Sequence, residues 1–189
     1  MMRITKPLTY ESMLQIAGKG GCVICAFLKN IQSAWLDHPG LDEGSGLCNY
    51  HGWAIAAASD GKAAAETFLR LIKHPEQHHG STECELCKQV LEEEANKVRE
   101  LRNTMRDPEV LEWLEQKQAL CIRHARKLAV VAGPANWERV IGVAEAAVEK
   151  MRGDLQAFLS ESARGAHSGG GVLGRAAELL FGYRGLPRP

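Results

Sequence analysis

The chain has 189 residues, of which 45% are hydrophobic, so it is long enough for one ordinary domain or two small ones. Lysine and arginine together number 23, aspartate and glutamate also number 23, and the sequence pI is about 7.0. Because nucleic-acid-binding proteins usually carry a basic excess, this balance argues against a nucleic-acid partner. Neither the segment Met1 to Gly20 nor any later stretch has the continuous apolar run of a signal peptide or a membrane span. We therefore expect a cytoplasmic protein without membrane association.

The first half of the chain predicts helices around its first two cysteine motifs. After the CxxC motif of Cys22 and Cys25, apolar residues recur at spacings of three and four, as one face of a helix requires. These residues are Ile24, Leu28, Ile31 and Trp35. His38-Pro39-Gly40 is expected to end this helix. The CxxH motif of Cys48 and His51 then opens a helical stretch over 53–58, and a further helix follows over 63–72.

The second half predicts the same order of elements around Cys84/Cys87 and Cys121/His124. The helix after the second CxxC carries an apolar face formed by Cys87, Leu91, Ala95, Val98, Leu101 and Met105. Asp107-Pro108 predicts the start of a short helix, and Gly133-Pro134 divides the helix after His124 from a long one. The long helix carries a stripe that we expect to form a helix-bundle core: Trp137, Ile141, Ala144, Val148, Met151, Leu155 and Phe158.

This order predicts an all-α fold class, in which a helical bundle is built from two duplicated metal-binding repeats plus a C-terminal helix. No run of alternating polar and apolar residues is long enough to indicate a sheet. We predict a first repeat over 1–80, a second over 81–164, and a glycine-rich linker with a C-terminal helix and tail over 165–189. The pairs Trp35-Leu36 and Trp113-Leu114, each ahead of a CxxH motif, support the duplication.

Every cysteine of the chain belongs to one of these four motifs. In the reducing cytoplasm such cysteines are more often metal ligands than disulfide partners. Each copy supplies three sulfurs and one imidazole, which is the ligand count of a tetrahedral metal site. The predicted metal ligands are Cys22, Cys25, Cys48, His51, Cys84, Cys87, Cys121 and His124.

Two identities of the metal group remain open at this point. Zinc is favoured, with two Zn²⁺ sites, because it binds Cys₃His sets readily. An iron–sulfur cluster such as 4Fe-4S is the alternative, because cysteine thiolates hold such clusters and a histidine replaces a cysteine in some of them. Copper, redox dithiols and an absence of metal are less favoured readings of the same residues.

The pairing of the motifs is also open. In the local assignment each CxxC shares a metal with the CxxH that follows it, so that Cys22, Cys25, Cys48 and His51 form one set. In the crossed assignment each CxxC uses the CxxH of the other copy. We predict the local assignment, because closing a shorter loop costs less entropy.

The residues that carry these motifs resemble a family of uncharacterised bacterial proteins of about this size. The family pattern is CxxC, a helix and Leu/Phe-Cys-x-x-His, repeated twice, followed by a C-terminal helix that ends near Gly-x-Arg-Gly. Here Leu47 and Leu120 precede the CxxH motifs, and the segment Arg175 to Gly185 matches the C-terminal element. The resemblance covers nearly the whole chain. It implies an all-helical, cysteine-rich protein and brings no activity with it.

The sequence favours a structural or protein-interaction role with an unidentified protein partner, and the alternative is an iron–sulfur protein for electron transfer or sensing. A metal ion with four protein ligands has no open position for water or substrate, so we do not expect an enzyme, and we identify no catalytic residues. The sequence does not indicate the partner or the oligomeric state.

Overall fold

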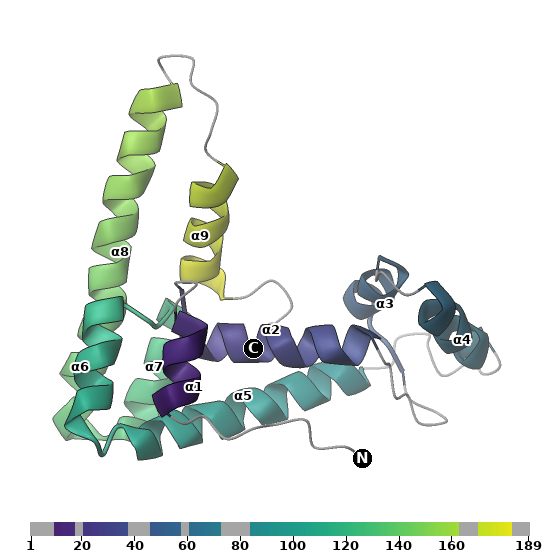
Figure 1. Cartoon of the computed structure of the whole chain (residues 1–189), viewed down its shortest axis with the longest axis horizontal. Helices are drawn as coiled ribbons and strands as arrows, with labels where there is room; N and C mark the ends of the chain where they lie inside the picture. Colours follow the sequence, from purple (N-terminus) through teal and green to yellow (C-terminus); the bar gives the residue numbers. More distant parts are fainter. Residues whose placement is uncertain are drawn as a thin grey trace. The chain divides into compact units, whose positions relative to one another are not determined.

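The computed structural model describes residues 10–17, 21–37, 46–57, 61–72, 84–162 and 170–182 (Figure 1). Within these ranges the regular structure is helical, apart from one isolated bridge between Gly46 and Cys84, and the all-α fold class is confirmed. The helices are α1 Tyr10–Ala17, α2 Val23–Asp37, α3 Asn49–Ala56, α4 Gly61–Ile72, α5 Glu85–Thr104, α6 Pro108–Lys117, α7 Ile122–Ala132, α8 Pro134–Ser162 and α9 Gly170–Phe181. None of these helices is both long enough and apolar enough to cross a lipid bilayer.

The described residues form two compact units. The first contains those from Leu28 to Glu94, and the second contains those from Tyr10 to Phe27 together with those from Ala95 to Gly182. Both divisions fall inside helices, in α2 and in α5. The units therefore combine segments that are distant in the sequence. The repeat boundaries expected at 80/81 and 164/165 lie outside the described residues and stay a prediction.

In the second unit, α7 packs on both α8 and α9, and α6 packs on α8 (Figure 1). Asp107 begins α6 by accepting a hydrogen bond of 3.0 Å from the backbone N–H of Glu109, with Pro108 in the first turn as the sequence predicts. Gly133, with φ +81°, joins α7 to α8 in a backbone conformation that side chains rarely adopt. The second unit thus contains the most extensive helix packing of the described chain.

In the first unit, α3 packs on α4, and the core includes the apolar face of α2. Leu28 and Trp35 of the predicted stripe are buried, as are Leu86 and Val90 on the first turns of α5. The helix α3 has eight residues, of which only His51 and Ile55 are buried.

The predicted core stripe of α8 is only partly correct. Ala144 is buried, but Trp137 is 45% exposed, and the stripe residues from Val148 onward are half-buried. The residues that α8 buries are Val140, Val143, Ala144 and Ala147. These buried positions lie on one side of the 29-residue helix, and this side is rotated relative to the predicted apolar stripe. Small side chains at this contact allow a partner helix to approach closely.

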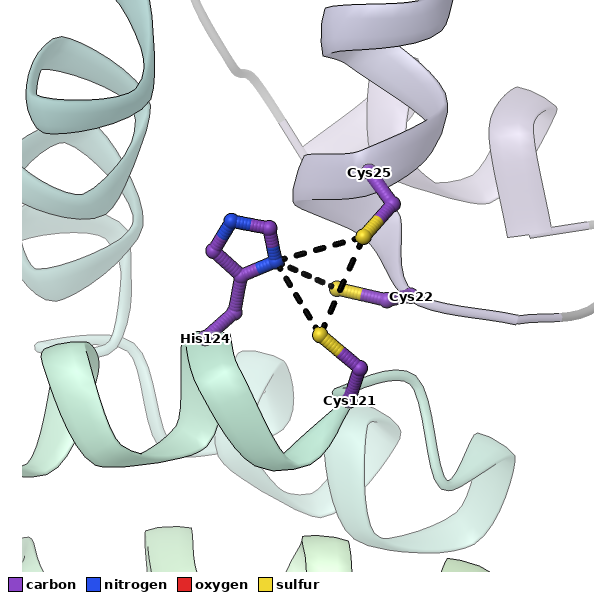
Figure 2. A group of neighbouring side chains, drawn as sticks. All are labelled: Cys22, Cys25, Cys121 and His124. Carbon is purple, nitrogen blue, oxygen red and sulfur yellow. Dashed lines mark hydrogen bonds between the residues drawn. The ribbon is translucent and has the colours of Figure 1, made fainter. Parts of the chain in front are cut away.

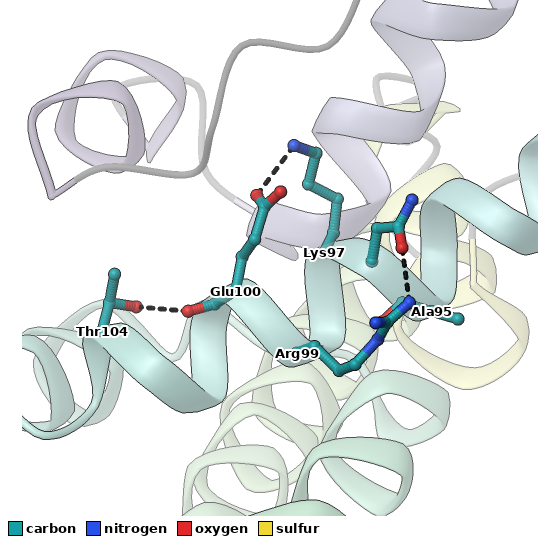
Figure 3. A network of polar contacts seen from close by, with 6 residues as sticks. Ala95, Lys97, Arg99, Glu100 and Thr104 are labelled. Carbon is teal, nitrogen blue, oxygen red and sulfur yellow. Dashed lines mark hydrogen bonds and ion pairs between the residues drawn. The ribbon is translucent and has the colours of Figure 1, made fainter.

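A fully buried lysine on α5 also belongs to the second unit (Figure 3). The Nζ atom of Lys97 donates to Oε2 of Glu100 over 2.8 Å and lies 5.1 Å from the centroid of the Phe27 ring. A buried ammonium group needs such partners, because an uncompensated charge in the interior is costly. Lys97 therefore links α5 to the first turns of α2, which begins at a cysteine motif.

We predict that Leu128→Ala lowers the free energy of unfolding by about 2–5 kcal/mol, because Leu128 is fully buried on α7 and its loss leaves a cavity. The matched control is Val130→Ala on the same helix, where the side chain is 72% exposed and the change stays within about 0.5 kcal/mol. Urea unfolding followed by circular dichroism at a fixed zinc concentration measures both. Equal losses for the two variants would contradict the packing of α7.

Candidate metal centres

The four cysteine motifs occupy the same position on four helices. In each motif the first cysteine immediately precedes a helix, and the last residue is the third of that helix. The carbonyl oxygen of that cysteine accepts the first helical hydrogen bond in every case: from Ala26 to Cys22 (3.0 Å), Gly52 to Cys48 (2.9 Å), Lys88 to Cys84 (3.0 Å) and Ala125 to Cys121 (2.9 Å). Side chains at these two positions lie on the same side of a helix start, as in a capping box. Each motif therefore presents two donor atoms at one helix N-terminus.

The structure brings all eight predicted ligands together, in two groups of four. The α2–α7 site contains Cys22, Cys25, Cys121 and His124, and the α3–α5 site contains Cys48, His51, Cys84 and Cys87. Within each group the ligand atoms lie within 4.8 Å of one another. Each site lies wholly inside one compact unit.

This grouping corrects the predicted local assignment. The first CxxC shares its site with the second CxxH, and the second CxxC shares its site with the first CxxH. In the sequence, all four ligands of the α3–α5 site therefore lie between the CxxC motif and the CxxH motif of the α2–α7 site. The entropy argument for the local assignment was wrong because other interactions determine which helix starts meet.

In the α2–α7 site, one ring nitrogen faces three sulfur atoms (Figure 2). The Nδ1 atom of His124 lies 3.2 Å from Sγ of Cys22, 3.3 Å from Sγ of Cys25 and 3.2 Å from Sγ of Cys121. The Sγ atoms of Cys25 and Cys121 are 3.8 Å apart.

The α3–α5 site repeats this geometry. Nδ1 of His51 lies 3.4 Å from Sγ of Cys48, 3.3 Å from Sγ of Cys84 and 3.4 Å from Sγ of Cys87. The Sγ atoms of Cys48 and Cys87 are 3.7 Å apart. Both histidines therefore direct the same ring nitrogen toward three sulfurs.

Hydrogen bonds alone do not account for these contacts. A neutral ring nitrogen either donates one proton or accepts at one lone pair, so it cannot form three equivalent hydrogen bonds. A single tetrahedral ion with metal–sulfur bonds of about 2.3 Å and a metal–nitrogen bond of about 2.0 Å would place sulfurs about 3.8 Å apart and sulfur about 3.5 Å from nitrogen. The observed distances are close to these values. Each group of four could hold one metal ion.

Each site also has a backbone hydrogen bond of the same kind, which the sequence did not indicate. The N–H of Val23 donates to the carbonyl of Ala119 over 3.1 Å, and the N–H of Glu85 donates to the carbonyl of Gly46 over 3.2 Å. In both cases the donor follows the first cysteine of a CxxC, and the acceptor lies two residues before the cysteine of a CxxH. This bond fixes the segment before the CxxH against the helix that bears the CxxC. Only knowledge of the crossed pairing could have indicated these partners.

Burial makes the thiolate forms of several ligands costly. It raises the pKa of Cys22, Cys84 and Cys87, whereas hydrogen bonds from Cys22 and Cys25 hold the pKa of Cys121 far below its usual range. Burial also lowers the pKa of His51 to about 4, so its imidazole is neutral at pH 7 and has a lone pair for a ligand. A bound cation would offset the thiolate cost, and the positive ends of two helices per site act in the same direction.

Comparison with models of known protein families, with curated proteins and with solved structures gives no match. The family resemblance therefore stays a prediction from the cysteine and histidine spacing.

We predict that pairs of alanine substitutions will report the crossed grouping directly. Cys25→Ala with Cys121→Ala removes two ligands from the α2–α7 site and leaves the other site complete, so one zinc ion per chain should survive dialysis against a competing chelator. Cys25→Ala with Cys48→Ala damages both sites, so neither ion should survive. Inductively coupled plasma mass spectrometry measures the metal content. If the second pair kept one ion and the first kept none, the local assignment would be restored.

We also predict that loading both sites with zinc at pH 7.5 releases at least three protons per chain. The raised pKa values keep Cys22, Cys84 and Cys87 protonated at this pH, and each must lose its proton to bind metal. His51 contributes none, because its pKa of about 4 leaves it neutral already. Titration calorimetry in buffers of different ionisation enthalpy counts the protons. A release of fewer than three protons would show that some of these thiols are ionised before metal binds.

Proposed function

We propose that this chain is a structural zinc protein that binds one Zn²⁺ in each Cys₃His site. The observation that carries the proposal is the convergence of each set of four ligand atoms within 4.8 Å, with sulfurs 3.7 and 3.8 Å apart. Zinc takes this ligand set in tetrahedral geometry, at distances that fit this spacing.

The spacing argues against the iron–sulfur alternative. A 4Fe-4S cluster binds each protein ligand at a different iron, and a 2Fe-2S cluster binds two ligands at each of its two irons, so some of the four ligand atoms must be separated by the width of the cluster. In this structure all four ligand atoms of each site lie within 4.8 Å of one another. Here the Sγ atoms of Cys25 and Cys121 are close enough to bind one atom. The geometry therefore supports a single ion in each site.

The closed ligand sets support a structural role. Four protein ligands leave no coordination position for water, and the ligands come from two helix starts that metal bonds would hold together. A structural zinc ion contributes on the order of 10 kcal/mol to folding, comparable with the net stability of about 5–15 kcal/mol of a typical domain. Three thiolates leave each zinc site with a net negative charge, which the two helix N-termini partly compensate.

The proposed role of the zinc-stabilised fold is to present a surface to a protein partner. Large apolar side chains are exposed on both units, including Trp53 on α3, Val130 on α7 and Trp137 on α8. Aromatic side chains of this kind are enriched at protein interfaces. The balanced charge of the chain favours a protein over a nucleic acid.

We predict that native protein purified without oxygen contains about two zinc ions per chain, is colourless, and holds neither iron nor sulfide. Replacing zinc with Co²⁺ should produce the visible absorption of tetrahedral cobalt with thiolate charge-transfer bands, because cobalt reports geometry that zinc does not. Elemental analysis and the absorption spectrum provide the test. A brown protein with bound iron and sulfide would overturn the zinc proposal in favour of the electron-transfer alternative.

A further inference from the structure

The two sites have the same ligand set but different surroundings. In the α2–α7 site, Cys25 and Cys121 are buried and one sulfur ligand, Cys22, is half-buried. In the α3–α5 site, two sulfur ligands are half-buried, Cys48 and Cys87. These are also the two sulfurs that lie 3.7 Å apart. The α3–α5 site therefore has two half-buried cysteines whose sulfurs are neighbours, whereas the α2–α7 site has one half-buried cysteine.

The residue before each CxxH shows the same difference. Leu120 is 1% exposed beside the α2–α7 site, whereas Leu47, its counterpart beside the α3–α5 site, is only half-buried. Apolar cover of this kind limits the access of solvent and small reactants to a metal site. Access is therefore easier at the α3–α5 site.

The histidine of the α3–α5 site also lacks outer support. Its Nε2 atom is buried and has no hydrogen-bond partner among the described residues. Histidines that bind metal usually donate this second N–H to a carboxylate or carbonyl, and losing that bond typically costs about 10–100-fold in metal affinity or activity. The ring of His51 is therefore held less firmly than that of a metal-binding histidine whose second N–H donates a hydrogen bond.

The helix that carries Cys48 and His51 depends on the site for its position. α3 has eight residues, fewer than the roughly 12–15 that an isolated helix needs, and it buries only His51 and Ile55. α7, which carries the corresponding motif of the other site, buries His124, Ala125, Leu128 and Ala129 and packs on α8 and α9. Loss of the metal ion would release α3 but leave α7 held by its packing.

From these contrasts we infer that Cys48 and Cys87 form a peroxide-sensitive pair, whose oxidation to a disulfide expels the zinc ion of the α3–α5 site and releases α3. The inference rests on the proposed zinc binding and adds a modification site to it. The α2–α7 site loses its ion more slowly under the same conditions.

The reaction needs only a peroxide as oxidant. A zinc-bound thiolate of Cys48 or Cys87 attacks one peroxide oxygen, so that the O–O bond breaks, a sulfenic acid forms, and hydroxide leaves and takes up a proton as water. The second thiolate then attacks the sulfenic sulfur over the short gap, forming the S–S bond and expelling hydroxide, which also becomes water. The two thiolates lose two electrons in total, and the peroxide gains them. With two of its four ligands gone, the site no longer holds Zn²⁺ tightly.

The test is a hydrogen peroxide titration of the zinc-loaded full chain, with a zinc-sensitive dye to follow release. We expect one of the two zinc ions to leave at least about tenfold faster than the other. Tandem mass spectrometry should find the Cys48–Cys87 disulfide as the first product, and circular dichroism should show a small loss of helix. If both ions left at the same rate, or if the first disulfide used Cys84 or Cys22, the inference would be wrong although zinc binding stood.

Two variants with one site each provide the matched control. Cys25→Ala with Cys121→Ala retains only the α3–α5 site and should release its single ion as fast as the first ion of the native chain. Cys48→Ala with Cys87→Ala retains only the α2–α7 site and should release its ion at the slower rate. A reversed order of these rates would overturn the inference. A native chain that bound no zinc before peroxide was added would instead refute the proposed function.

Discussion

The structure depends on the meeting of two helix N-termini at each group of four ligand atoms. A CxxC or CxxH motif at a helix start directs two donors to one point, and a second helix start must supply the other two. Burial raises the pKa of the thiols of Cys22, Cys84 and Cys87, and the partial positive charge of the helix ends favours their ionisation only weakly. A divalent cation bound between the two helix starts would make the buried thiolates favourable.

The sequence predicts the ligands but not their grouping. Every cysteine lies in a CxxC or CxxH motif, whose spacing places two donors on the same side of a helix start. The eight donors can therefore be predicted from the sequence. The grouping rests on which helix starts meet, and loop entropy is a weak guide to it. In the observed grouping, Cys25 and Cys121 share a site although they lie 96 positions apart in the sequence. This loop is about two doublings longer than the loop from Cys25 to Cys48 in the local assignment, and the difference in closure entropy costs only about 1 kcal/mol. Bonds such as that from Glu85 to Gly46, together with helix packing, easily exceed that difference.

The helices themselves were largely predictable, and their partners were not. Asp107 and Pro108 mark the start of α6 through local chemistry that operates in any context. The stripe of α8 shows where the sequence is insufficient. Periodicity identifies the apolar side of a helix, but Trp137 is half-exposed because the neighbours of α8 cover a different part of its surface. The helix α1, which has only eight residues, was not predicted at all. Burial is a property of pairs of elements, which a single sequence does not specify.

The asymmetry between the sites follows from what each helix does beyond its motif. The segment that bears Cys121 and His124 continues into α7, whose buried residues pack on α8 and α9. The segment that bears Cys48 and His51 continues into α3, which offers Ile55 as its only other buried side chain. Equal ligand sets therefore lie in unequal surroundings, because α7 buries several residues against α8 and α9, whereas α3 buries few and packs on α4. A metal ion at each site would have the same donors, and the packing of the helix behind it would decide how much of the fold depends on that ion.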